Sequence, residues 1–177
     1  MPRHIAFLRA VNVGGRTVKM DALRAHFEAL GLARVETFIA SGNVIFEAPA
    51  KAAAKLPAKI EAALLAALGF EVHTFVRTDA ELAAVVSHAA TLKAAPTLNV
   101  GFLAEPMSRE AEKLLMKLRS EIDDFHVHGR EVYWLCKKKQ SESTFSNTVF
   151  EKALKLRTTF RGISTVQKLS AKYPPVR

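Results

Sequence analysis

The feature that most constrains the fold of this 177-residue chain is the turn Ser41-Gly42-Asn43, which separates two runs of residues that favour β-strands. The runs lie at 34–40 and 43–47. Glycine and asparagine adopt the positive φ that a tight hairpin needs, so the pattern predicts two antiparallel neighbours in one sheet. The rest of the first half must supply the elements that complete this sheet.

Helices and strands alternate on both sides of the hairpin. A strand predicted at 5–11 precedes a helix with Asp21 as its N-cap. After the hairpin, Pro57 suits the first turn of a second helix, which ends at Gly69 before a strand at 70–76. The order βαββαβ predicts a ferredoxin-like α+β fold, also called an alpha-beta plait.

The second half repeats this rhythm less clearly, and no final strand is evident. The predicted elements are a helix opened by a Thr78-x-x-Glu81 capping box, a strand at 98–104, a helix from Ser108, two strands within 124–136, a helix at 146–156 and a shorter helix after Ser164. We therefore predict two ferredoxin-like subdomains, 1–78 and 79–177, the second with extra C-terminal helices.

The positive charge is concentrated at the C-terminal end. The net charge is +9, yet residues 1–136 carry 16 basic and 15 acidic side chains, whereas residues 137–177 carry ten and two. Such asymmetry is typical of a basic surface that attracts an anionic partner, and a solubilising surface without a partner is the alternative.

Composition also excludes several classes of protein. No apolar run approaches the roughly 20 residues that span a bilayer, and the N-terminus lacks the pattern of a signal peptide. Cys136 is the only cysteine, so the chain has no internal disulfide and no cysteine metal cluster. We expect a cytoplasmic protein without a membrane partner and without a cofactor.

The segment RAVNVGGRTVKM, residues 9–20, is a candidate anion site. It matches neither the Walker A pattern G-x-x-x-x-G-K-[ST] nor the Rossmann fingerprint G-x-G-x-x-G, the two common nucleotide-binding loops. Gly14 and Gly15 could still expose backbone N–H groups, and Arg16 and Lys19 could supply charge, although a plain turn with solvated cations is the alternative. Arg9 lies late in the predicted strand and needs a partner, which could be Glu36, Glu47 or a bound anion.

The segment TTFRGISTVQKL, residues 158–169, is a second candidate. Thr159 and Arg161 precede a helix that a Ser164-x-x-Gln167 capping box is expected to open, and Lys168 follows one turn later. Donors before a positive helix end suit a phosphate or a carboxylate, and hydrogen bonding between subdomains is the competing use.

Catalytic and metal-binding residues are not evident. His126 and His128 share one face of a strand, but no third ligand has a recognisable spacing, so no metal is expected. Cys136 ends an apolar strand and is expected to be buried. Of the neighbours Tyr133 and Trp134, one is expected to be exposed, and no RNA-recognition motif is present.

The motifs FLRAVNVGGRTVKM, SGNV and TTFRGISTVQKL together resemble the bacterial Domain of Unknown Function 1697 family across essentially the whole chain. The resemblance implies two alpha-beta plait domains and no particular activity. Ala10 and Gly162 replace the glycine and asparagine usual in the family. The signature positions that it carries over are Arg9, Asn12, Gly14, Gly15, Lys19, Ser41, Gly42, Asn43, Thr159, Arg161 and Thr165.

These residues lie in three segments far apart in sequence, and we hypothesise that the segments converge on one groove. The leading interpretation is a binding module for an anionic partner, either nucleic acid backbone or a phosphorylated small molecule. The alternatives are a small enzyme acting on a phosphate- or carboxylate-bearing substrate and a structural or assembly protein without a ligand. The ligand residues predicted in this way are Arg9, Asn12, Gly14, Gly15, Lys19, Ser41, Asn43, Thr159, Arg161, Ser164, Thr165 and Lys168.

Overall fold

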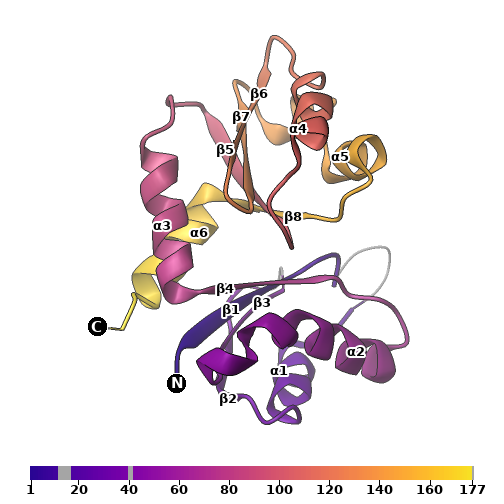
Figure 1. Ribbon diagram of the computed structural model, residues 1–177, viewed down its shortest axis with the longest axis vertical. Coiled ribbons are helices and arrows are strands. Elements are labelled where there is room, and N and C mark those ends of the chain that lie inside the picture. Colours follow the sequence, from indigo (N-terminus) through magenta and orange to yellow (C-terminus); the bar gives the residue numbers. More distant parts are fainter. Residues whose placement is uncertain (12–16, 40–41, 177) are drawn as a thin grey trace. The chain divides into compact units, whose positions relative to one another are not determined.

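The computed structural model describes residues 1–11, 17–39 and 42–176. The chain forms two compact units, Met1–Ala83 with Tyr173–Arg177 (unit 1) and Ala84–Lys172 (unit 2). Each unit contains one four-stranded antiparallel sheet (Figure 1). Among the described residues, every helix is too short or too polar to cross a membrane.

Unit 1 contains the predicted hairpin and both predicted helices. Its elements are β1 (Arg3–Leu8), α1 (Met20–Glu28), β2 (Ala33–Thr37), β3 (Asn43–Glu47), the 3-10 helix η1 (Ala50–Lys55), α2 (Leu56–Leu68) and β4 (Thr74–Thr78). The strand order is β2-β3-β1-β4 with every pair antiparallel. This order is that of a ferredoxin-like sandwich, so the predicted fold is confirmed.

The core of unit 1 lies between its sheet and its two helices (Figure 1). Leu23 and Phe27 of α1 and Ile60 and Leu64 of α2 are four residues apart, which places each pair on one helix face. These side chains and the inward side chains of the strands, among them Phe46, form one buried cluster.

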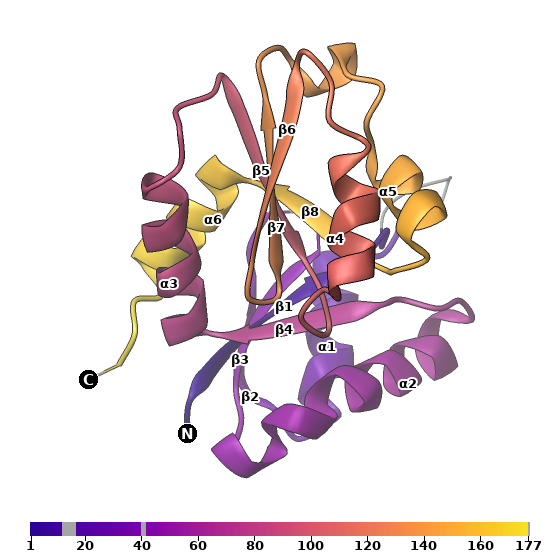
Figure 2. The same ribbon diagram turned by 45° about the horizontal axis from the view of Figure 1, so that its top comes forward.

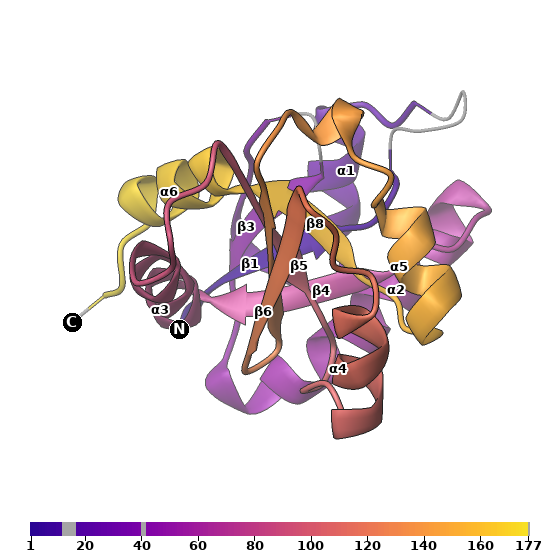
Figure 3. The ribbon, with the colours of Figure 1, turned by 90° about the horizontal axis from the view of Figure 1, so that it is seen from above.

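Unit 2 has the same topology. The helix α3 (Asp79–Ala90), which begins in unit 1 and ends in unit 2, follows β4 directly. Then come β5 (Thr97–Phe102), α4 (Arg109–Met116), β6 (Asp123–His128), β7 (Glu131–Cys136), the 3-10 helix η2 (Gln140–Glu142), α5 (Asn147–Leu154), β8 (Thr159–Gly162) and α6 (Ile163–Lys172). The strand order β6-β7-β5-β8 matches that of unit 1 element by element. Figures 2 and 3 show α4 and α5 side by side on one face of this sheet.

The prediction that the second half lacks a final strand is wrong, because β8 pairs with β5. This strand has only four residues, TFRG. Because Arg161 occupies one of its two buried positions, the sequence lacks the alternation of apolar and polar residues that predicts a strand. As in unit 1, the last strand leads straight into a helix, α6 after β8 and α3 after β4.

Two predicted helix starts are also wrong. The N-cap of α1 is Lys19, which makes no side-chain capping bond, and Asp21 lies in the first turn. Ser164 does not cap α6, because the helix begins at Ile163 directly after β8. The capping box of α3 is confirmed: Thr78 N–H donates to Glu81 Oε2 at 2.8 Å, and Glu81 N–H donates to Thr78 Oγ1 at 3.1 Å.

Candidate functional site

Several predicted ligand residues of unit 1 lie outside the described residues, namely Asn12, Gly14, Gly15 and Ser41. Arg9 follows β1 and is half-buried, and its backbone N–H donates to the His73 carbonyl at 2.9 Å. Lys19 is exposed. The two acids suggested as partners of Arg9 have other neighbours: Glu36 accepts a bond of 2.5 Å from the Tyr173 hydroxyl, and Glu47 lies 3.6 Å from Arg34.

Asn43 and Gly42 stabilise the first hairpin. Asn43 is buried, and its Nδ2 donates to the Phe38 carbonyl at 2.8 Å, while Phe38 N–H donates to the Asn43 carbonyl at 3.0 Å. Gly42 has φ +85°, and a Cβ at this position would lie 3.1 Å from Leu8 Cβ. The described part of the SGN motif therefore has a structural role in holding the connection between β2 and β3.

The predicted residues of unit 2 lie on β8 and α6. Arg161 is 7% exposed, and its Nη1 donates to Thr159 Oγ1 at 2.7 Å and to the Phe160 carbonyl at 3.0 Å. Burial lowers the pKa of Arg161 to about 10. On α6, Thr165 is half-buried, and Ser164 and Lys168 are exposed. The predicted groove would combine segments of both units, and it stays a prediction.

Arg77 is a buried arginine that the sequence analysis did not single out. It is the counterpart of Arg161, because Arg77 pairs with Ile5 of the central strand β1 as Arg161 pairs with Val100 of β5. Its Nη1 donates to the carbonyl of the preceding residue, Val76, at 3.0 Å, as in Arg161. An arginine inside the apolar run FVRT was the available signal.

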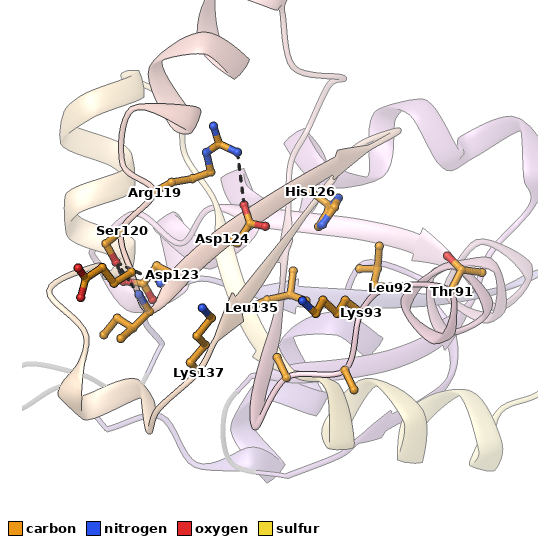
Figure 4. Close-up of a pocket in the computed structure, with 14 residues that line it drawn as sticks. Thr91, Leu92, Lys93, Arg119, Ser120, Asp123, Asp124, His126, Leu135 and Lys137 are labelled. Atoms are coloured by element: carbon orange, nitrogen blue, oxygen red, sulfur yellow. Dashed lines mark hydrogen bonds and ion pairs between the residues drawn. The ribbon is translucent and has the colours of Figure 1, made fainter.

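A pocket of about 730 Å³ lies within unit 2 (Figure 4). The segment between α3 and β5, the turn before β6 and the adjoining ends of β6 and β7 contribute its lining. The lining residues are Thr91, Leu92, Lys93, Ala94, Ala95, Arg119, Ser120, Glu121, Ile122, Asp123, Asp124, His126, Leu135 and Lys137. Leu135 of β7 pairs with Asp124 of β6, so both side chains project from the same sheet face. The volume is within the range of small-molecule sites.

The acidic residues of this lining are largely engaged. The Asp124 carboxylate lies 4.0 Å from the Arg119 guanidinium. Asp123 is buried and accepts hydrogen bonds from Trp134 Nε1 at 2.8 Å and from the Ser143 hydroxyl at 2.6 Å. Glu121 is exposed on the turn before β6. Asp123 and Asp124 on the strand therefore already have partners other than the two lysines.

Lys93 and Lys137 are the free cations of the pocket. Both are exposed, and within the described residues neither ammonium group forms an ion pair or a hydrogen bond. In the view of Figure 4, the Leu135 side chain lies between these two lysines. An anion in this pocket would therefore meet two unpaired positive charges beside an apolar floor.

Three histidines gather beside the pocket, on the same face of the sheet. The His88 ring of α3 stacks on His128 with centroids 3.9 Å apart and contacts Tyr133 at 4.9 Å. Burial lowers the pKa of His88, the charges of His128 and His126 lower it further, and Glu131 opposes them. Among the described residues, no group of three or more His, Cys, Asp or Glu side chains is placed to hold a metal ion.

Neither Tyr133 nor Trp134 is exposed, so the prediction for this pair is wrong. His88 contacts Tyr133 on one face of β7, and Phe145 contacts Trp134 on the other. Cys136 is buried as predicted, and desolvation raises the pKa of its thiol, which disfavours the nucleophilic thiolate.

Comparison with known proteins supports the fold and the family. A conserved bacterial protein, SP0830 from Streptococcus pneumoniae, has a similar solved structure, with a TM-score of 0.73, 23% identity, and coverage of 96% of this chain and 97% of that chain. At this identity the likeness shows the fold alone. No curated protein matches the sequence. The family model described as "Protein of unknown function (DUF1697)" matches residues 1–133, and the chain therefore belongs to this family.

Proposed function

We propose that this chain is a cytoplasmic binding module for an anionic ligand and that the pocket of unit 2 is a binding site for that ligand. The observation that carries the proposal is the pair Lys93 and Lys137, whose ammonium groups have no partner among the described residues and which line one pocket with Leu135. A lysine exposed to bulk water gains little from a distant charge, but two lysines around one concave site act on the same ligand.

The ligand chemistry follows from the donors. An ammonium group has three N–H donors and no acceptor, so it recognises a carboxylate or a phosphate oxygen. Arg119 adds a guanidinium to the lining, although it lies beside Asp124. The lining carries three basic residues and three acids, Glu121, Asp123 and Asp124, so its formal charges balance. The proposal therefore rests on the two lysine ammonium groups that have no partner among the described residues.

The test compares two double variants by calorimetric titration with inorganic pyrophosphate at low salt. Lys93→Gln with Lys137→Gln is expected to weaken binding at least about tenfold, because each charge-assisted hydrogen bond contributes about 1.5–3 kcal/mol. Lys51→Gln with Lys59→Gln removes the same charge from exposed positions of unit 1 and is expected to leave the affinity unchanged. Equal losses in both variants, or no binding by the unmodified chain, would contradict the proposal.

The groove predicted from RAVNVGG, SGN and TTFRGIST is a second candidate site for the same kind of ligand. Nucleic acid backbone and a phosphorylated small molecule differ in their dependence on salt, because a polyanion releases several counterions when it binds. Oligonucleotide binding that falls steeply with salt, and falls again in Arg161→Gln, would favour nucleic acid at this groove.

A structural role is the second candidate for the signature residues themselves. The bonds of Asn43 to Phe38 and of Arg161 to Thr159 favour it, because both side chains stabilise their own segments. Asn43→Ala with lower stability and unchanged anion affinity would support this role. An enzyme acting on a phosphate- or carboxylate-bearing substrate is a further possibility, in which His126 would be the imidazole nearest a pocket-bound substrate.

A further inference from the structure

We infer that the pocket of unit 2 takes a small amphiphilic anion, a carboxylate or phosphate head that carries an apolar chain, rather than an extended polyanion. The inference rests on the proposed function and names its ligand class. The first observation is the apolar part of the lining. Leu135 is 7% exposed and forms the floor on β7, while Leu92 and Ile122 come from the segments on either side.

Apolar side chains lie beside the charged ones in this lining. Ala94 and Ala95 extend the apolar surface along the segment between α3 and β5, next to Lys93. A free phosphate ion bound by the lysines would leave this surface in contact with water. A ligand with an apolar chain would bury it, and the burial of apolar surface stabilises binding in proportion to the area covered.

The pocket lacks the features that suit a nucleic acid strand. Among the described residues, its lining contains no Phe, Tyr or Trp side chain on which a base could stack. It also contains Glu121, which is exposed, and the pair of Asp124 with Arg119. A polyanion with a phosphate at every nucleotide would bring further negative charge toward these carboxylates, whereas a ligand with one charged head places its charge at the lysines alone.

Size supports the same class of ligand. The volume of about 730 Å³ is far larger than one phosphate or carboxylate group needs, and it is in the range of sites that bind a small organic molecule. The segment 91–95 follows α3 and contributes five of the lining residues, so one wall of the pocket is a loop that can vary in sequence without disturbing the sheet.

The test is a series of calorimetric titrations of the full chain with straight-chain carboxylates from acetate to octanoate and with the corresponding monoalkyl phosphates. Each added CH2 group is expected to tighten binding about fourfold until the pocket is filled, since a buried CH2 contributes about 0.8 kcal/mol. The carboxylate and phosphate series distinguish the two heads. Straight-chain alcohols of equal length are expected to bind at least about tenfold more weakly, because they lack the charged head.

Two variants distinguish the contribution of the ligand's apolar chain from that of its charged head. Leu92→Ser, at a half-buried position of the segment after α3, is expected to flatten the dependence on chain length and to leave the affinity for inorganic pyrophosphate unchanged. Leu65→Ser, an exposed leucine of α2, is the matched control and is expected to change neither. Lys93→Gln with Lys137→Gln is expected to weaken every member of the series by a similar factor.

The possible failures are distinguishable. Pyrophosphate binding that depends on the two lysines, together with an affinity for carboxylates and alkyl phosphates that does not depend on chain length, overturns this inference and leaves the proposed function intact. No binding of any anion overturns both. Binding that tightens with chain length equally in Leu92→Ser and in the unmodified chain places the apolar chain elsewhere and also overturns the inference.

Discussion

Unit 1 and unit 2 each form a sheet with the same strand order, but different residues occupy equivalent positions in the two sheets. Ala6 of β1 lies between Val44 and Val76, and at the matching position Gly101 of β5 lies between Val132 and Phe160. A Cβ on Gly101 would lie 2.7 Å from the Phe160 ring. Glycine on β5 thus faces the larger phenylalanine on β8, whereas alanine on β1 faces the smaller valine on β4. The two pairs differ in residue type but fill a similar total side-chain volume.

A second pair of equivalent positions is polar in both units. His4 pairs with Phe46 on β3 as Asn99 pairs with Trp134 on β7, and both polar side chains are buried. The His4 ring stacks on Phe46 with centroids 5.5 Å apart. Asn99 cannot titrate and His4 can, so the same architectural position gives the two units different responses to pH.

The proposed anion site lies where the two units differ. The pocket lies at the start of β6 and on the segment after α3, and its lysines are not part of the shared strand pattern. The shared topology thus positions the sheet, and the segments that connect its strands and helices supply the charged side chains of the proposed site.

The largest expected effect tests the aromatic pair Phe46 and Trp134. Phe46→Ala and Trp134→Ala are each expected to lower the free energy of unfolding by about 3–5 kcal/mol, because each leaves a cavity in its core. Trp134→Ala is expected to cost more, since it also removes the Nε1 donor of the buried Asp123 carboxylate. Urea denaturation measures both, and equal costs would argue against a stabilising role for that hydrogen bond.

The next largest effect is expected from the close packing of Gly101 against Phe160. Gly101→Ala is expected to destabilise unit 2 by about 1–3 kcal/mol through overpacking. Adding Phe160→Val, which imitates Val76 of unit 1, is expected to make the alanine better tolerated than it is beside phenylalanine. The double-mutant cycle gives the coupling between the two sites, and purely additive costs would contradict the proposed compensation.

The pH dependence of stability sharpens the comparison of His4 with Asn99. Desolvation lowers the pKa of His4 from its ordinary value of 6.5, against smaller opposing effects of the Pro2 backbone, Asp79 and Glu81. The unfolded chain then binds the proton more readily, so stability is present above about pH 6.5 and is lost as the pH falls below it, by up to about 1.4 kcal/mol per pH unit.

The matched variant is His4→Asn, which gives unit 1 the residue that unit 2 has at this position. Its unfolding free energy is expected to change less between pH 7 and acid conditions than that of the unmodified chain. The pKa of His88 is also lowered, so some acid sensitivity is expected to persist in the variant. An unchanged pH profile would show that His4 does not carry the effect.

The smallest expected effects concern helix caps. Ser146 accepts a hydrogen bond of 3.2 Å from Val149 N–H at the start of α5, whereas Lys19 at the start of α1 makes no capping bond. Ser146→Ala is expected to cost about 1 kcal/mol, and Lys19→Ser is expected to stabilise unit 1 by about 0.5 kcal/mol. Thermal denaturation would show the opposite signs, and a loss of stability in Lys19→Ser would contradict the comparison.

Local signals in the sequence predicted much of the fold. Pro57 in the first turn of α2, Gly69 at its left-handed C-cap with φ +80°, and the positive φ of the hairpin glycines Gly42 and Gly129 are as expected. Each depends on the backbone preferences of one or two residues, which act over a few positions and can be read without knowing the neighbouring strands. The order of elements, apart from the missed strand β8, followed from these boundaries.

The candidate site was less accessible to the same reasoning. Arg161 was singled out as a donor and Arg77 was not, although both are buried at equivalent places in their sheets. The pocket draws on residues from 91 to 137, and nothing in the sequence brings Lys93 beside Lys137. Proximity of this kind depends on the pairing of β6 with β7 and on the path of the chain after α3.

By itself, the sequence determined the alternation of helices and strands before β8, both hairpins, the start of α3, the end of α2 and the basic C-terminal segment. These properties arise from dihedral preferences, hydrophobic period and charge, which are carried by neighbouring residues. Only the tertiary structure decided that TFRG is a strand, that Tyr133 and Trp134 are both covered, and that two lysines share a pocket. Each of these depends on contacts between residues distant in the chain, and local sequence preferences do not predict such contacts.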